Sequence, residues 1–110
     1  MFKRENRLVP GVRFGKSYLL TSSQFVLKER RNGLSVNRFG IVVSKKIDKR
    51  AVIRNKIKRI FREALSELNK NLVPGHDILL IAKKEVLAKT KEENTLAIKS
   101  ALGNSGIFKK

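Results

Sequence analysis

The stretch VIRNKIKRIFREALSELN, residues 52–69, decides how this chain folds. Its apolar residues recur at steps of three, four and seven, a spacing that places them on one face of an α-helix. With Ile57 set at zero and 100° per residue, this apolar face spans about −60° to +80°. We therefore predict an amphipathic helix. One side of its remaining surface, from about 60° to 200°, forms a basic stripe of Arg54, Lys58, Arg62, Asn55 and Arg59.

Shorter segments on both sides of this helix have the composition of strands. Residues 24–28 and 39–43 fit strands and Asn32-Gly33 between them is a turn signal, so we expect the two to pair antiparallel. Residues 77–82 form a continuous apolar run, which is typical of a central strand buried on both faces. The interval from Val12 to Leu20 is too mixed to assign, and stays open as a short helix or an irregular segment.

A second helix is expected near the end of the sequence. Thr90 is a suitable N-cap, with Glu92 and Glu93 in the first turn, and Gly103 can end the helix. Helices packed on one small sheet make the fold class α+β, in a single domain over residues 1–110. The apolar residues of this expected helix are Leu96, Ile98, Ala101 and Leu102.

The composition restricts the possible chemistry. The 110 residues include 26 Lys and Arg against 9 Asp and Glu, for a net charge of +17, with one His (His76) and no Cys. This excludes a disulfide scaffold, a thiolate zinc site, a cysteine nucleophile and a paired-histidine site. No spacing of carboxylates indicates a metal site, so we expect neither a catalytic residue nor a protein-bound metal.

The excess of positive charge indicates a polyanionic partner, either nucleic acid or an anionic membrane. Residues 45–62 contain nine basic residues and only one acidic residue, Asp48. Since apolar residues interleave these charges, the block is expected to fold rather than to form a disordered tail. Binding to an RNA or DNA backbone is the expected role of the basic stripe, and a merely solvated basic face is the alternative.

The same block carries a family resemblance. Ser44-Lys45-Lys46-Ile47, then Ala51-Val52-Ile53-Arg54-Asn55-Lys56-Ile57-Lys58-Arg59 and Arg62-Glu63, closely resembles the signature of the protein subunit of bacterial ribonuclease P. The resemblance implies an αβββαβα arrangement, with a mixed four-stranded sheet and a left-handed β-α-β crossover. Pro10-Gly11 stands where this family has helix, so we expect the first helix to be shortened or lost.

The resemblance also implies a function, the removal of the 5′ leader from precursor tRNA by a ribonucleoprotein whose RNA subunit holds the catalytic magnesium ions. The protein itself would supply no catalytic residue and no cofactor site. It would bind the ribonuclease P RNA through Lys45, Lys46, Arg50, Arg54, Asn55, Lys56, Lys58, Arg59 and Arg62. The single-stranded leader of the precursor tRNA would lie in a cleft between the sheet and the first and last helices, lined by Phe14, Val26, Lys28, Lys84 and Phe108.

Two other functions stay open when the residues are considered alone. A general basic RNA-binding protein, of the ribosomal or RNA-chaperone type, would have the same charge without requiring this ordered motif. A basic amphipathic helix could bind an anionic membrane, but here its apolar face is needed for the sheet. The charged start and the lack of any apolar run of roughly 18 residues predict a cytoplasmic protein without a membrane partner. No obligate protein partner is inferred.

Overall fold

The amphipathic helix forms as predicted. In the computed structural model, which describes residues 6–8 and 17–109, helix α1 spans Ala51–Asn69. The side chains that it buries all belong to the predicted apolar face, and they are Ile57, Phe61, Ala64 and Leu65. The opposite side of the helix, with most of the basic stripe, faces solvent.

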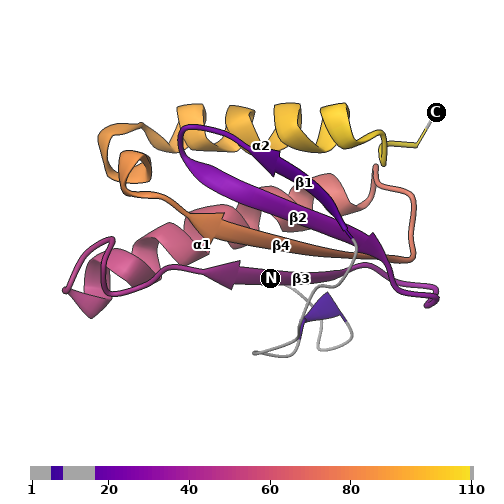
Figure 1. Cartoon of the computed structure of the whole chain (residues 1–110), viewed down its shortest axis with the longest axis horizontal. Coiled ribbons are helices and arrows are strands. Elements are labelled where there is room, and N and C mark those ends of the chain that lie inside the picture. The colour runs from indigo at the N-terminus through magenta and orange to yellow at the C-terminus, as the bar shows by residue number, and fades with distance from the viewer. Residues whose placement is uncertain (1–5, 9–16, 110) are drawn as a thin grey trace.

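Four strands form one mixed sheet in the order β1-β2-β4-β3 (Figure 1). The strands are β1 (Tyr18–Thr21), β2 (Phe25–Arg31), β3 (Arg38–Val42) and β4 (His76–Ala82). Strand β2 pairs antiparallel with both β1 and β4, whereas β3 and β4 are parallel. The mixed four-stranded sheet implied by the resemblance is thus confirmed, and β4 is central as its apolar run predicted.

The expected antiparallel pairing of residues 24–28 with residues 39–43 is wrong, because β4 lies between these two strands. The connection after β2 does not close a tight hairpin. Instead, Asn32 donates from Nδ2 to the Asp77 carboxylate at 3.0 Å, and the His76 backbone N–H donates to Asn37 Oδ1 at 2.8 Å. Both asparagines therefore bind the first residues of β4 and hold that strand between β2 and β3.

Strand β1 occupies part of the interval that sequence patterning left unassigned. Tyr18 and Leu19 are 42% and 56% exposed, so this edge strand lacks the buried alternation that marks a strand in sequence. The shortened first helix would fall in residues 1–5 and 9–16, which lie outside the described part of the chain.

Strands β3 and β4 are joined by α1 in a left-handed crossover. In the view of Figure 1, α1 lies behind the sheet, β4 lies above β3, and both strands point to the left. Nearly all β-α-β connections have the opposite hand. The family resemblance implied this crossover, and the general rule would have excluded it.

The second long helix, α2, spans Lys91–Ser105 and begins with a complete capping box between Thr90 and Glu93. It does not end at Gly103 as expected, but continues to Gly106, whose φ of 79° supplies the left-handed C-cap. Of the apolar residues of this helix, Ile98, Ala101 and Leu102 are buried, whereas Leu96 is 65% exposed. A 3-10 helix, η2 (Lys84–Ala88), precedes α2 and was not predicted.

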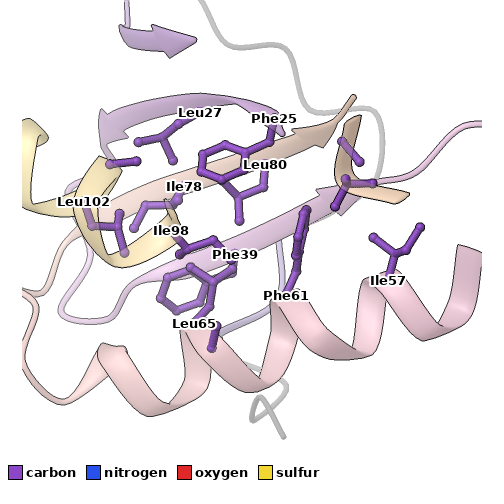
Figure 2. Close-up of a cluster of buried hydrophobic side chains, with 14 of the residues drawn as sticks. Phe25, Leu27, Phe39, Ile57, Phe61, Leu65, Ile78, Leu80, Ile98 and Leu102 are labelled. Atoms are coloured by element: carbon purple, nitrogen blue, oxygen red, sulfur yellow. The ribbon is translucent and has the colours of Figure 1, made fainter. Parts of the chain in front are cut away.

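The hydrophobic core fills the space between the sheet and the two long helices (Figure 2). Phe25 from β2 meets Phe61 from α1 edge to face, with ring centroids 6.0 Å apart. Such an aromatic pair adds about 0.5–1.5 kcal/mol beyond the burial of its surface. Because α1 and α2 contribute to the same core, they cover one face of the sheet and leave the other without a long helix among the described residues.

Candidate nucleic-acid interface

Strand register defines the sheet face that points away from α1 and α2, here called the open face. Successive side chains of a strand point to opposite faces, and paired residues of neighbouring strands share a face. Phe25 and Leu27 are buried in the core, so Val26 and Lys28 point the other way. Two rows of paired residues cross the open face: Thr21, Val26, Ile81 and Val42, and beside them Leu19, Lys28, Leu79 and Gly40.

The open face is apolar with one cation near its middle. Val26, Lys28, Leu79 and Ile81 are half-buried, so the expected burial of the 77–82 strand on both faces is only partly met. Leu19 exposes 56% of its surface. Side chains of this kind can contact bases while a lysine neutralises a phosphate, without demanding a particular sequence.

A third row places an ion-pair network at one end of the open face. The Asp77 carboxylate is fully buried between Arg30 of β2 and Arg38 of β3. Arg38 donates to both carboxylate oxygens, from Nε at 2.7 Å and from Nη2 at 2.8 Å, and Arg30 Nε donates at 3.1 Å. Two guanidinium groups are thus held on the sheet, with about a quarter of each side chain exposed (25% and 27%).

The hydrogen bonds of this network set the charge of Asp77. Burial alone raises the pKa of an aspartate, but the hydrogen bonds from Arg38, Asn32 and Arg30 outweigh it, so the pKa of Asp77 lies below its ordinary value. Sequence reasoning missed this network. An aspartate at the start of an otherwise apolar strand was the available signal, because a buried carboxylate requires partners.

The N-terminal residues 6–8 border the open face at β3. The Leu8 backbone N–H donates to the Phe39 carbonyl at 2.9 Å, and Leu8 is 8% exposed. A Cβ at Gly40 would lie 3.0 Å from Leu79 Cδ1 and 3.2 Å from Leu8 Cδ2. The missing side chain of Gly40 therefore allows Leu8 to pack over the sheet.

The far end of β4 carries two lysines. Lys83 follows the strand, and its Nζ donates to the Ser22 carbonyl at 2.9 Å. Lys84 begins η2 and is exposed. Lys84 therefore lies beyond the end of β4 that is farther from Arg30 and Arg38.

One other residue expected in the same cleft, Phe108, is not brought to this face. Phe108 forms an isolated bridge with Leu72, after the end of α1, and lies beside Gly103 of α2. It is therefore on the helix side of the sheet, away from Val26 and Lys28. Phe14 lies outside the described residues.

On α1, the basic stripe is mostly exposed. Asn55, Arg59 and Arg62 are exposed, and Lys58 is half-buried. Arg54 instead folds back, since its Nη1 donates to the carbonyls of Asp48 at 2.9 Å and Lys49 at 2.8 Å. Arg54 therefore shapes the loop before α1. Lys45, Lys46 and Lys56 are also exposed.

Arg50 is engaged in a similar way. Its Nε and Nη2 lie 3.1 and 2.9 Å from the two carboxylate oxygens of Asp48, and its backbone N–H donates to the same group. The Arg50 side chain and then its backbone N–H lower the pKa of Asp48 to about 2. Asp48 therefore stays charged at neutral pH and offsets one positive charge in this block.

Within the described part of the chain, the His, Asp and Glu side chains do not assemble a metal site. Across residues 6–8 and 17–109, there is no group of three or more His, Cys, Asp or Glu side chains that could hold a metal ion. His76 is 9% exposed, and its Nδ1 lies 3.0 Å from the Val73 carbonyl. In the same part of the chain, no helix is long and apolar enough to cross a membrane.

Comparison with known proteins identifies the family. The model of the family Ribonuclease P matches residues 2–105. A ribonuclease P protein component from Clostridium botulinum is 35% identical over 97 residues, covering 87% of this chain and 85% of the relative. The RNase P protein of Staphylococcus aureus superposes with a TM-score of 0.77 at 30% identity, covering 84% of each chain. That of Thermotoga maritima, solved with 1-(4-fluorophenyl)-2-thiourea, gives 0.72 at 31%, covering 79% of this chain and 84% of the other. This chain belongs to the ribonuclease P protein family.

Proposed function

We propose that this protein positions precursor tRNA for cleavage by the RNA of ribonuclease P, using two separate surfaces. The exposed part of the basic stripe, together with Lys45, Lys46 and Lys56, docks on the ribonuclease P RNA. The open face holds the single-stranded 5′ leader of the precursor tRNA. Membership of the ribonuclease P family supports the general role, and the charge and placement of the two surfaces support the division of labour.

The open face is the observation that carries the leader assignment. It presents apolar side chains around Lys28 with a pair of arginines at one end, and Lys84 follows the strand end on the other side. Phosphates of an extended strand can contact these cations while its bases rest on Val26 and Ile81. Contacts of this kind tolerate different sequences, as the varied leaders of many precursor tRNAs require.

We propose further that the chemistry belongs to the RNA. Hydrolysis assisted by magnesium needs oxygen ligands that are free to bind the ion and orient water. Asp48 and Asp77 both have their oxygens engaged by arginines, so they are poor donors for such an ion. The magnesium ions of the holoenzyme are then held mainly by RNA, and the protein lowers the repulsion between two polyanions.

A crosslinking experiment tests the leader assignment. The protein is reconstituted with a bacterial ribonuclease P RNA and a precursor tRNA that carries one photoreactive base a few nucleotides upstream of the cleavage site. We expect crosslinks to Val26, Lys28 or Ile81, and none to Arg59 or Arg62. Crosslinks confined to α1 would contradict the assignment. A protein that failed to stimulate the RNA at all would instead be a general RNA-binding protein.

A further inference from the structure

The structure places Phe108 in a groove that the two surfaces described above do not include. This C-terminal groove lies between the ends of α1 and α2 and the end of the chain, with a volume of about 490 Å³. It is lined by Leu68, Lys70, Asn71, Lys99, Phe108 and Lys109. Its size falls within the range of pockets that hold small organic ligands, roughly 300–1,000 Å³.

Backbone pairing fixes the aromatic ring at this position. The Val73 N–H donates to the Ile107 carbonyl, and the Lys109 N–H donates to the Asn71 carbonyl, both at 2.7 Å. Ile107 is buried with 4% exposure, whereas Phe108 is only half-buried and faces the groove. A Cβ added to Gly103 would lie 3.8 Å from the Phe108 ring, so the ring lies against α2 at a residue without a side chain. The segment is thus pinned on both sides of an accessible aromatic.

The charge around this ring is strongly positive. Three exposed lysines from three separate segments, Lys70, Lys99 and Lys109, line the groove, against one carboxylate, Glu67. None of the ion pairs found among the described residues uses these three lysines. An aromatic ring between uncompensated lysines is the combination that binds an unpaired nucleotide, because the base stacks on the ring and the lysines contact the flanking phosphates.

The groove is separate from the basic stripe and from the open face. Its helix residues Glu67 and Leu68 follow Arg62, the last residue of the stripe, by about 8–9 Å along α1, and at 100° per residue they lie on another side of the helix. It is also on the helix side of the sheet, whereas the open face is on the other side. A short leader segment bound on the open face would therefore not also contact the Phe108 ring.

We propose that the C-terminal groove is a second RNA site, which binds one unpaired nucleotide by stacking it on Phe108 between Lys70, Lys99 and Lys109. The nucleotide can come from the ribonuclease P RNA or from the precursor tRNA, because both present the same base and phosphate chemistry. This proposal does not depend on the assignment of the leader to the open face.

The test uses a pentamer of uridine and the full chain, labelled with nitrogen-15. We expect the pentamer to shift the backbone amide signals of Lys70, Lys99 and Phe108, and to do so equally in a Lys28→Gln variant, whose open face is impaired. Phe108→Leu keeps an apolar side chain but removes the ring, and should weaken binding at these signals at least about fivefold, since stacking is worth roughly 1–3 kcal/mol. Phe108→Tyr should restore it.

Three results would overturn the proposal. The first is an absence of shifts at these residues, and the second is unchanged affinity in Phe108→Leu. The third is an equal loss in Phe108→Leu and Phe108→Tyr, which would mark a purely structural role. Shifts at the same residues with anionic phosphatidylglycerol vesicles but not with the pentamer would assign the groove to lipid. If the proposal is supported, two binding measurements with Phe108→Leu identify the RNA that supplies the nucleotide. Weaker binding of the isolated ribonuclease P RNA identifies that RNA as the source. Weaker binding of the precursor tRNA, with binding of the ribonuclease P RNA unchanged, identifies the precursor tRNA.

Discussion

Arg38 and Asp77 form a two-point ion pair across the parallel strands β3 and β4, with nitrogen to oxygen distances of 2.7 and 2.8 Å. They are also direct partners in the strand register, and Arg30 occupies the matching position on the other side of Asp77. One buried carboxylate therefore ties together the three strands β2, β4 and β3 at the end of the open face. The ion pair fixes the positions of two arginines that RNA can approach.

The first prediction is that Asp77→Asn strongly destabilises the fold. It leaves two guanidinium groups without their shared carboxylate, and removing one partner of a buried ion pair costs about 3 kcal/mol or more. Urea denaturation should show this loss. Asp48→Asn removes a carboxylate that pairs with the exposed Arg50, so it serves as the control and should lose much less. Equal losses of unfolding free energy in the two variants would mean that the buried ion pairs of Asp77 stabilise the fold no more than the exposed pair of Asp48.

The second prediction concerns the pH dependence of stability. The pKa of Asp77 is lower in the folded protein than in the unfolded chain, where it is about 3.9. The unfolded state therefore takes up protons first as the pH falls. The contribution of Asp77 is complete above about pH 5, and it is lost as the pH falls through the folded-state pKa. Unfolding measured between pH 7 and pH 3 should show a steeper decline for the wild type than for Asp77→Asn. Parallel curves would contradict the lowered pKa.

The third prediction is that the exposed basic stripe determines how RNA binding responds to salt. Lys58→Gln with Arg59→Gln should preserve the fold, because both residues lie off the buried face of α1. The slope of log affinity against log salt for the ribonuclease P RNA should fall by up to roughly 0.7–0.9 for each lost phosphate contact. Lys89→Gln with Lys91→Gln removes the same charge from the segment around the start of α2 and should leave the slope nearly unchanged. The hypothesis fails if both pairs change the slope alike.

Arg54 should behave differently from its neighbours on the stripe. Its hydrogen bonds to the Asp48 and Lys49 carbonyls hold the loop that leads into α1, and the N-cap Arg50 makes no side-chain capping bond there. Arg54→Lys keeps the charge but cannot reproduce the planar guanidinium. We expect weaker RNA binding and faster amide exchange at residues 48–51 in this variant. Unchanged exchange would show that the loop does not need Arg54.

Local signals predicted the two long helices, through the apolar periodicity of α1 and the capping residues at the start of α2, because such signals depend on neighbouring residues. The order of the strands could not be predicted in the same way. Asn32-Gly33 has the local chemistry of a hairpin turn, but Asn32 binds Asp77, 45 residues away in sequence. A long-range contact of this kind overrides the local signal and moves β3 to the other side of β4.

In the candidate site, too, features set by neighbouring residues could be predicted, and features set by long-range contacts could not. The angular position of the basic stripe follows from 3.6 residues per turn, so its exposure could be predicted. The hydrogen bonds of the Arg54 side chain to the Asp48 and Lys49 carbonyls depend on the loop conformation. The position of Phe108 depends on backbone pairing with residues 71–73. Neither contact has a periodic signal. The family resemblance assigned Phe108 to the leader cleft, and the structure places it on the opposite side of the sheet.

The last prediction concerns the open face and is the most direct test of leader recognition. Lys28 stands between Leu19 and Leu79 in the central row of that face, where no other strand residue supplies a positive charge. Lys28→Gln should therefore weaken binding of precursor tRNA to the reconstituted holoenzyme, by about tenfold if its ammonium group contributes as much as a typical charge-assisted hydrogen bond. Binding of mature tRNA should be unaffected, because mature tRNA has no leader. Thr90→Ala, which removes the capping box of α2 at a cost of about 1 kcal/mol, controls for a general loss of stability and should leave both affinities unchanged. If Lys28→Gln weakened precursor and mature tRNA equally, Lys28 would contact the body of the tRNA, and the leader would have to lie elsewhere.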